Sequence, residues 1–131
     1  MNYKQIISAC EASAHLVSMV PVERVVEFGY SIGLNSDTSV LDFCCGYGEM
    51  LNLWNEAFGI NVVGIDIHEP FIVEGKTRVR GDRINLIAGD IFAYSDSKRY
   101  DVVVCTELSA GLFEDFASGI AFIEKHLKQG G

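Results

Sequence analysis

The residues of this chain that could do chemistry are acids and glycines placed within or just after short apolar runs. Asp42 lies inside the run 40–50, and Gly46 and Gly48 follow it with one residue between them. Glycine adopts positive φ and has no Cβ, so a ligand can approach the backbone of such a turn closely. A helix that begins after the turn would direct its first N–H groups at that ligand.

Three further acids, Asp66, Asp90 and Glu107, follow later apolar runs. The spacing from Gly46 to Asp66 is close to the roughly 20 residues expected for an acid that binds the two hydroxyls of a ribose. A carboxylate can accept both donors of a vicinal diol. Several carboxylates at one edge suit a ligand that carries positive sulfonium and ammonium groups, and they suit a pyrophosphate poorly.

Alternating strand and helix patterns predict the elements that position these acids. Strands are predicted over 40–44, 62–65, 84–88 and 101–106, and helices over 3–18, from Pro21 to a stop at Gly33, over about 49–58 and 70–80, and along Phe116, Ile120, Ile123 and Leu127. This alternation predicts an α/β fold with a parallel sheet. Right-handed crossovers then gather the carboxyl ends of the strands at one edge, where ligands bind.

Length and composition limit the alternatives. A chain of 131 residues indicates a single domain, 1–131, with N-terminal helices over 1–34 and a core over 35–131. The formal net charge of −8 argues against nucleic acid as a partner. Neither a membrane-spanning apolar run nor a signal peptide is recognisable, so we expect a cytoplasmic protein without membrane partners.

The four cysteines are interpreted as small apolar residues in a reducing compartment. Cys10, Cys44, Cys45 and Cys105 show no C-x-x-C spacing, so no metal site is expected. Neighbouring strands would bring Cys45 and Cys105 near each other, which by itself makes neither a ligand.

The run from Asp42 to Gly48 resembles motif I of the class I S-adenosylmethionine (SAM)-dependent methyltransferases, in which an acid precedes a G-x-G-x-G loop. Asp42, Gly46 and Gly48 match that motif, and Cys44 stands in the place of its first glycine. The segment 127–131 is similar to the Leu-Lys-Pro-Gly-Gly turn before the family's fifth strand. The resemblance covers 40–131 and implies a Rossmann-like parallel sheet of order 3-2-1-4, flanking helices, an N-terminal helical segment and SAM as cofactor.

The resemblance also implies roles for individual residues. The expected cofactor-binding residues are Asp42, Cys44, Cys45, Gly46, Gly48, Asp66, Ile67, Asp90, Ile91, Cys105 and Thr106. The loop holds the methionine part of SAM and Asp42 helps to hold its ammonium, while Asp66 binds the ribose. Asp90 and Ile91 bind the adenine, with Ile91 also providing apolar cover. Glu107 is the candidate acceptor contact, and no catalytic base is assigned.

The function expected from these features is methyl transfer from SAM to a small-molecule acceptor. Two alternatives stay open: a SAM-binding or S-adenosylhomocysteine (SAH)-binding fragment without catalysis, and a nucleotide-binding oxidoreductase. The missing third glycine of G-x-G-x-x-G disfavours the oxidoreductase. An uncovered apolar strand at 101–106 would be an exposed edge, so we expect either a longer enzyme with further C-terminal strands or a homodimer that pairs through this strand.

Overall fold

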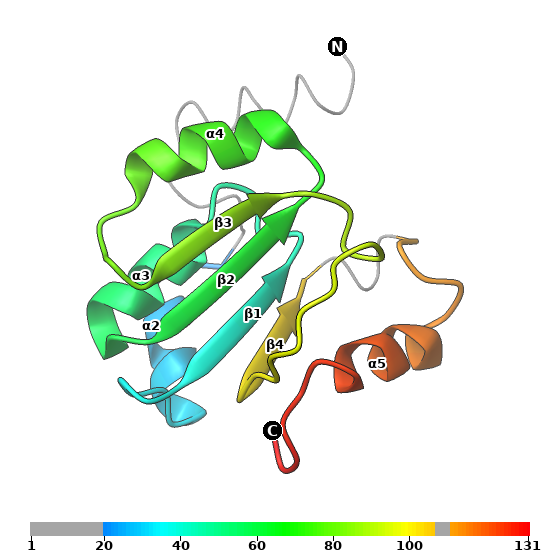
Figure 1. Ribbon diagram of the computed structural model, residues 1–131. Coiled ribbons are helices and arrows are strands. Elements are labelled where there is room, and N and C mark those ends of the chain that lie inside the picture. Colours follow the sequence, from blue (N-terminus) through cyan, green and yellow to red (C-terminus); the bar gives the residue numbers. More distant parts are fainter. Residues whose placement is uncertain (1–19, 107–110) are drawn as a thin grey trace.

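The computed structural model describes residues 20–106 and 111–131 (Figure 1). Its elements are α2 (Val22–Ser31), β1 (Ser39–Phe43), α3 (Glu49–Phe58), β2 (Asn61–Asp66), α4 (Glu69–Arg78), β3 (Ile84–Ala88), β4 (Val102–Cys105) and α5 (Phe116–Glu124). The helix predicted over 3–18 and the predicted acceptor contact Glu107 lie outside the described residues. Among the described helices, none is both long and apolar enough to cross a bilayer.

The four described strands form one parallel sheet in the order β3-β2-β1-β4, which confirms the predicted fold (Figure 1). Phe43 at the end of β1 is paired with Ile65 of β2 and with Cys105 of β4. Because all the strands run in the same direction, their carboxyl ends meet at one edge. The cofactor site is expected at that edge.

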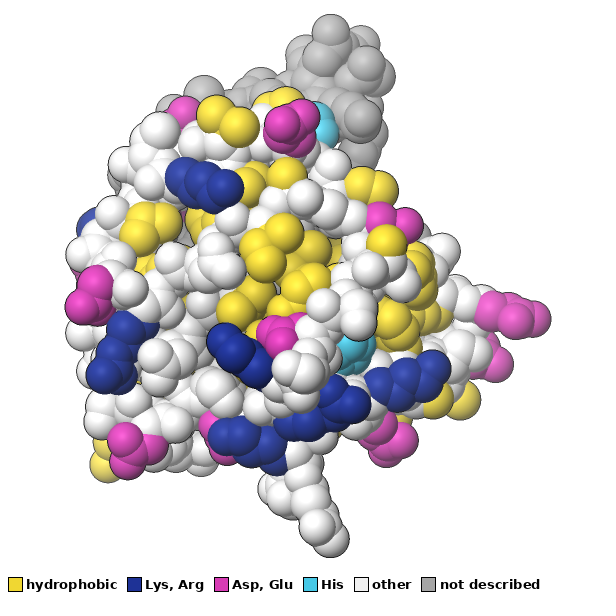
Figure 2. Space-filling model, in the orientation of Figure 1, with side chains coloured by type: hydrophobic (Ala, Val, Ile, Leu, Met, Phe, Trp, Pro, Cys, Tyr) yellow, Lys and Arg dark blue, Asp and Glu magenta, His cyan; other side chains and the backbone are white. Residues whose placement is uncertain are grey.

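Helices cover both faces of the sheet and bury two apolar clusters. On one face, α2, α3 and α4 contribute Val25, Trp54 and Ile72, and Trp54 is 1% exposed, as expected for a core residue. Its indole N–H donates to the Val25 carbonyl at 2.8 Å, so the buried donor is satisfied. On the other face, α5 packs around Phe43. Figure 2 shows hydrophobic side chains that remain visible at the centre of this second face.

The element ends differ from the predicted ones by one or two residues. Strand β1 ends at Phe43 because Cys44 adopts φ 63°, which no strand residue has. Strand β4 is shorter than predicted at both ends, and α4 begins at Glu69, one residue before Pro70. Helix α3 matches its predicted range and ends at Gly59 with φ 70°, a left-handed C-cap.

The starts of β1 and β4 are tied to the C-terminal segment through Asp101. Its Oδ2 accepts from Ser39 N–H at 2.8 Å and from Ser39 Oγ–H at 2.6 Å, and Lys128 Nζ lies 2.8 Å from both carboxylate oxygens. These contacts, led by those with Lys128 and Ser39, lower the pKa of Asp101 to about 2.

Replacement Asp101→Asn should therefore destabilise the protein in a pH-dependent way. The folded pKa lies below the unfolded value of about 3.9, so the stabilisation is present above pH 4 and is lost as the pH falls toward 2. Urea unfolding at several pH values should show a deficit in the variant at neutral pH that shrinks on acidification. A deficit that does not change with pH would contradict the ionic origin.

Candidate functional site

The loop after β1 turns sharply at the carboxyl edge of the sheet. Cys44, Gly46 and Gly48 all have positive φ, at 63°, 58° and 73°. The N–H groups of Cys44 and Cys45 both donate to the Ile65 carbonyl, at 2.8 and 3.1 Å. These bonds hold the start of the loop against the end of β2, and α3 begins directly after it.

Asp66 lies at the end of β2 and joins the glycine loop to the loop that follows β2. Its Oδ2 accepts from the Gly46 N–H at 2.8 Å, and its Oδ1 accepts from the His68 N–H at 2.8 Å. The side chain is 9% exposed. The structure thus brings Gly46 and Asp66 into contact. The bond between them was not predicted, because nothing in a sequence marks a side chain that bonds a distant backbone group.

Asp42 is a buried carboxylate with an unused oxygen. It is 3% exposed, and within the described part of the chain its Oδ1 has no hydrogen-bond partner. Burial raises its pKa well above the ordinary value, and the nearby Cys105 and Asp66 raise it further. A buried polar atom without a partner is costly and uncommon. At the end of β1, beside the loop, this oxygen is suited to a cationic or hydrogen-bond-donating ligand.

The two loop glycines have different surroundings. A Cβ built on Gly46 would have no described atom within 4 Å, so its backbone faces open space that a ligand can enter. A Cβ on Gly48 would lie 2.8 Å from Leu86 Cδ2, and one on Gly64 would lie 2.8 Å from Cys45 Sγ. Gly48 and Gly64 are therefore required by packing, whereas Gly46 leaves the approach to the loop open.

The segment after β3 carries the two residues expected to bind the adenine. The exposed Asp90 accepts from the Phe92 N–H at 2.9 Å and begins a short turn. The side chain of Ile91 is 4% exposed and belongs to the core cluster under α5, and its expected role as apolar cover stays a prediction. Phe92 and Ile67 are 53% and 75% exposed and offer apolar surface. The sequence analysis did not single out Phe92, which follows Asp90 by two residues.

The cysteines at this edge lie on different sides of the sheet. Cys45 packs against the cluster under α2, α3 and α4, while Cys105 belongs to the cluster under α5. The neighbouring strands β1 and β4 therefore do not bring these two cysteines into the same core cluster. Burial raises the pKa of the Cys45 thiol, which keeps it protonated at neutral pH. The described residues contain no cluster of three or more metal-ligating side chains. Thr106, the residue after β4, is exposed.

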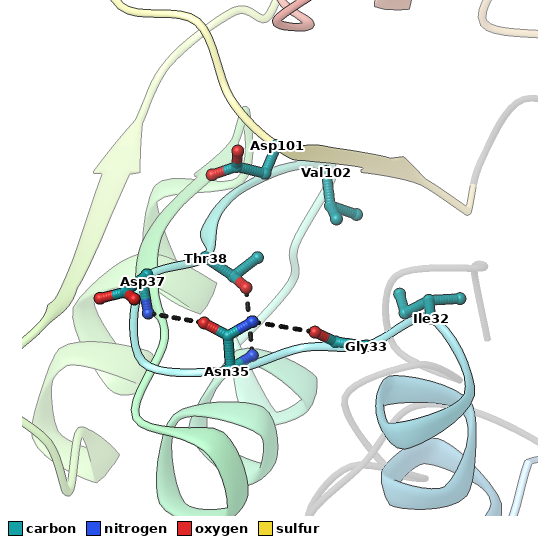
Figure 3. A pocket seen from close by; sticks show the side chains of 7 residues that line it. All are labelled: Ile32, Gly33, Asn35, Asp37, Thr38, Asp101 and Val102. Atoms are coloured by element: carbon teal, nitrogen blue, oxygen red, sulfur yellow. Dashed lines mark hydrogen bonds between the residues drawn. The ribbon is translucent and has the colours of Figure 1, made fainter. Parts of the chain in front are cut away.

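A hollow of about 280 Å³ lies at the opposite end of β1 and β4 (Figure 3). Its lining is Ile32, Gly33, Asn35, Asp37, Thr38, Asp101 and Val102. Several of its polar groups bond within the turn: Asn35 N–H donates to Thr38 Oγ1, and Asn35 Nδ2 donates to the Gly33 carbonyl. None of the predicted site residues lines this hollow, so the two places are distinct.

Cys44→Gly should be tolerated, because the backbone at this position already has a glycine-like conformation. A non-glycine residue in the left-handed region costs on the order of 1–2 kcal/mol, which offsets the lost packing of the thiol. We expect the free energy of unfolding to change by less than about 1 kcal/mol, whereas Cys44→Val, with a β-branched side chain, should lose about 1–2 kcal/mol. Urea unfolding of both variants measures this. Equal losses would show that the conformation at Cys44 carries no strain.

Comparison with known proteins identifies the family to which this chain belongs. The sequence model of a methyltransferase domain matches residues 40–131. The chain is 30% identical over 96 residues to a malonyl-[acyl-carrier protein] O-methyltransferase of Priestia megaterium, covering 72% of this chain and 34% of that protein. It is 30% identical over 123 residues to a ubiquinone biosynthesis O-methyltransferase of Rickettsia conorii, covering 92% of this chain and 41% of that protein. The chain thus spans about a third to two fifths of these relatives.

Comparison with solved structures leads to the same family. A SAM-dependent methyltransferase from Geobacter sulfurreducens in complex with SAH superimposes with a TM-score of 0.85 at 27% identity, covering 100% of this chain and 53% of that one. A SAM-dependent methyltransferase from Thiobacillus denitrificans, also in complex with SAH, gives 0.84 at 27% identity over 100% of this chain and 54% of that one. With the family match over 40–131, these likenesses show that the chain belongs to the methyltransferase domain family.

Proposed function

We propose that this chain binds SAM at the carboxyl edge of its sheet and serves in methyl transfer to a small-molecule acceptor. The observation that carries the proposal is Asp42, whose buried carboxylate keeps an oxygen without a partner among residues 20–106 and 111–131, beside the glycine loop. The ammonium of SAM is a donor that would satisfy this oxygen, directly or through a water. The family match supports the same cofactor.

The residues present fit such a cofactor. The loop at Gly46 can be approached by the methionine part, and Asp42 stabilises its positive charge. Asp66 is the ribose ligand, because each of its oxygens accepts one N–H and retains capacity for a hydroxyl. The backbone around Asp90 and Ile91 binds the adenine edge, and the exposed side chains of Ile67 and Phe92 are suited to cover the bound nucleoside. The main chain at Cys105 and Thr106 approaches the methionine end of the cofactor.

Bound SAM would supply a methyl carbon that the acceptor atom attacks in line, so that the new bond forms as the bond to the sulfonium sulfur breaks and SAH leaves. The protein's part is to hold the two reactants in line and to exclude water. A general base is needed only if the acceptor is protonated at working pH. Glu107 stays our proposed acceptor contact.

Two further parts of the proposal concern the acceptor and the assembly. The two curated relatives described above are named for different acceptors and do not identify the acceptor of this chain, for which a small molecule stays our proposal. Among the described strands, β4 pairs with β1 alone, and Val102–Val104 are half-buried. Pairing of two copies through β4 therefore stays a proposal, which light scattering at several concentrations would test.

Calorimetric titration of the full chain with SAH and, in parallel, with NADH tests the cofactor assignment. We expect SAH to bind with one site per chain and NADH not to bind. Binding of NADH in place of SAH would overturn the proposal in favour of an oxidoreductase. Methyl transfer is then measured separately, with labelled SAM and a panel of small metabolites, because the chain spans only part of its relatives' length.

A further inference from the structure

Tyr47, between the two loop glycines, is held by helix α4. Its ring centroid lies 4.8 Å from that of Phe71, and the guanidinium carbon of Arg78 lies over the ring at 4.5 Å. Arg78 is itself fixed by Glu74, with Nε and Nη2 each 3.0 Å from Glu74 Oε1. Phe71 and Arg78 are seven residues apart, so they lie on one face of α4.

The backbone of the loop also touches α4. A Cβ built on Gly75 would lie 2.5 Å from the Tyr47 carbonyl oxygen and 3.1 Å from its carbonyl carbon. Gly75 therefore lets the helix lie directly against the peptide of Tyr47. This contact explains a glycine in the middle of a helix, where it otherwise weakens helical structure.

The loop needs such an anchor because the two glycines on either side of Tyr47 allow many backbone conformations. Gly46 and Gly48 give the backbone access to many conformations, whereas a ligand requires one of them. The Asp66 bond fixes the Gly46 N–H, but it leaves the following peptide to be held by other contacts. Tyr47 is half-buried, and the described contacts of its ring are with Phe71 and Arg78 of α4.

We propose that Tyr47 is a positioning residue, which docks the glycine loop on α4 and so holds it in the conformation that binds the cofactor. The inference rests on the proposed function, since it assigns the docked loop to SAM binding. Aromatic stacking on Phe71 and the cation–π contact with Arg78 supply the anchor, and Gly75 makes the approach possible.

Tyr47→Ala is the test variant, Tyr47→Phe is the conservative rescue, and Tyr30→Ala is the matched control. Tyr30 lies on α2 and is 80% exposed, so the control removes the same side chain away from the loop. Calorimetry with SAH should show affinity weakened by at least about tenfold in Tyr47→Ala, and affinities within about twofold of the wild type in the other two. Wild-type affinity in Tyr47→Ala, or a loss in Tyr47→Phe as large as in Tyr47→Ala, would overturn the inference.

Amide hydrogen exchange without ligand separates this inference from the proposed function. Amides 45–48 should exchange faster in Tyr47→Ala than in the wild type, while those of α5 should not change. If wild-type protein fails to bind SAH, the proposed function fails, and exchange at 45–48 alone decides whether Tyr47 positions the loop. If Tyr47→Ala does not fold, Arg78→Gln removes the cation from the ring and should weaken SAH binding by about threefold, and unchanged affinity would contradict the anchor.

Discussion

Asp66→Ala is expected to weaken SAH binding by about 1.5–3 kcal/mol, on the order of 10- to 150-fold in Kd, the largest loss we expect from a single substitution. The variant loses the proposed acceptor for the ribose hydroxyls. It also leaves the N–H groups of Gly46 and His68 without the carboxylate that now binds both, at 2.8 Å each. The loop after β1 and the loop after β2 would thus lose their link.

Calorimetry with SAH measures this loss, and Asp82→Ala is the matched control. Asp82 is exposed in the loop before β3, so its removal should leave Kd unchanged. Asp66→Asn keeps the shape and one acceptor oxygen, and its affinity should fall between those of the wild type and Asp66→Ala. A change below about threefold in Asp66→Ala, with the fold intact, would show that the ribose is bound elsewhere.

Asp42→Asn should separate stability from binding. The charged form of Asp42 is costly in the ligand-free protein, because burial removes it from water and the nearby Cys105 and Asp66 disfavour its charge. Its neutral isostere should raise the free energy of unfolding at neutral pH by about 1–3 kcal/mol. The same change removes the negative charge that we assign to the ammonium of SAM, and should weaken SAH binding by about tenfold.

The pH dependence of Asp42→Asn follows from its raised pKa. The folded protein holds the Asp42 proton more tightly than the unfolded chain, whose value is about 3.9, so the penalty is absent in acid. It grows as the pH rises from about 4 toward the folded pKa, and it is complete above that value. Urea unfolding without ligand should therefore show an advantage of the variant that increases with pH. A wild-type protein more stable than Asp42→Asn at neutral pH would contradict this account.

Local patterns predicted the framework of the fold. The apolar run 84–88 and the amphipathic stretch 49–58 match β3 and α3 residue for residue, because strand and helix periods and Gly59 are all local signals. The end of β1 was misplaced by one residue, because no local signal shows that Cys44 adopts a glycine-like φ. The division at residue 34, the cytoplasmic location and the single-domain organisation stay predictions.

For the candidate site, the sequence predicted only which residues lie at the carboxyl ends of the strands. The alternation of strands and helices predicted a parallel sheet, and the family resemblance implied its order, so Asp42 and Asp66 were expected at one edge. The unused oxygen of Asp42 and the docking of Tyr47 on α4 depend on how elements distant in sequence approach each other. Such contacts leave no periodicity or spacing to find.

The central claim is that SAM binds at the carboxyl edge of the sheet, and mapping of SAH on the ¹⁵N-labelled chain by NMR tests it most directly. We predict that the largest amide shift changes fall in 44–48, 66–68 and 90–92. The turn that lines the hollow at the other end of the strands, residues 35–38, should not respond. Shifts concentrated in 35–38, or no shift at millimolar SAH in a well-folded sample, would contradict the account.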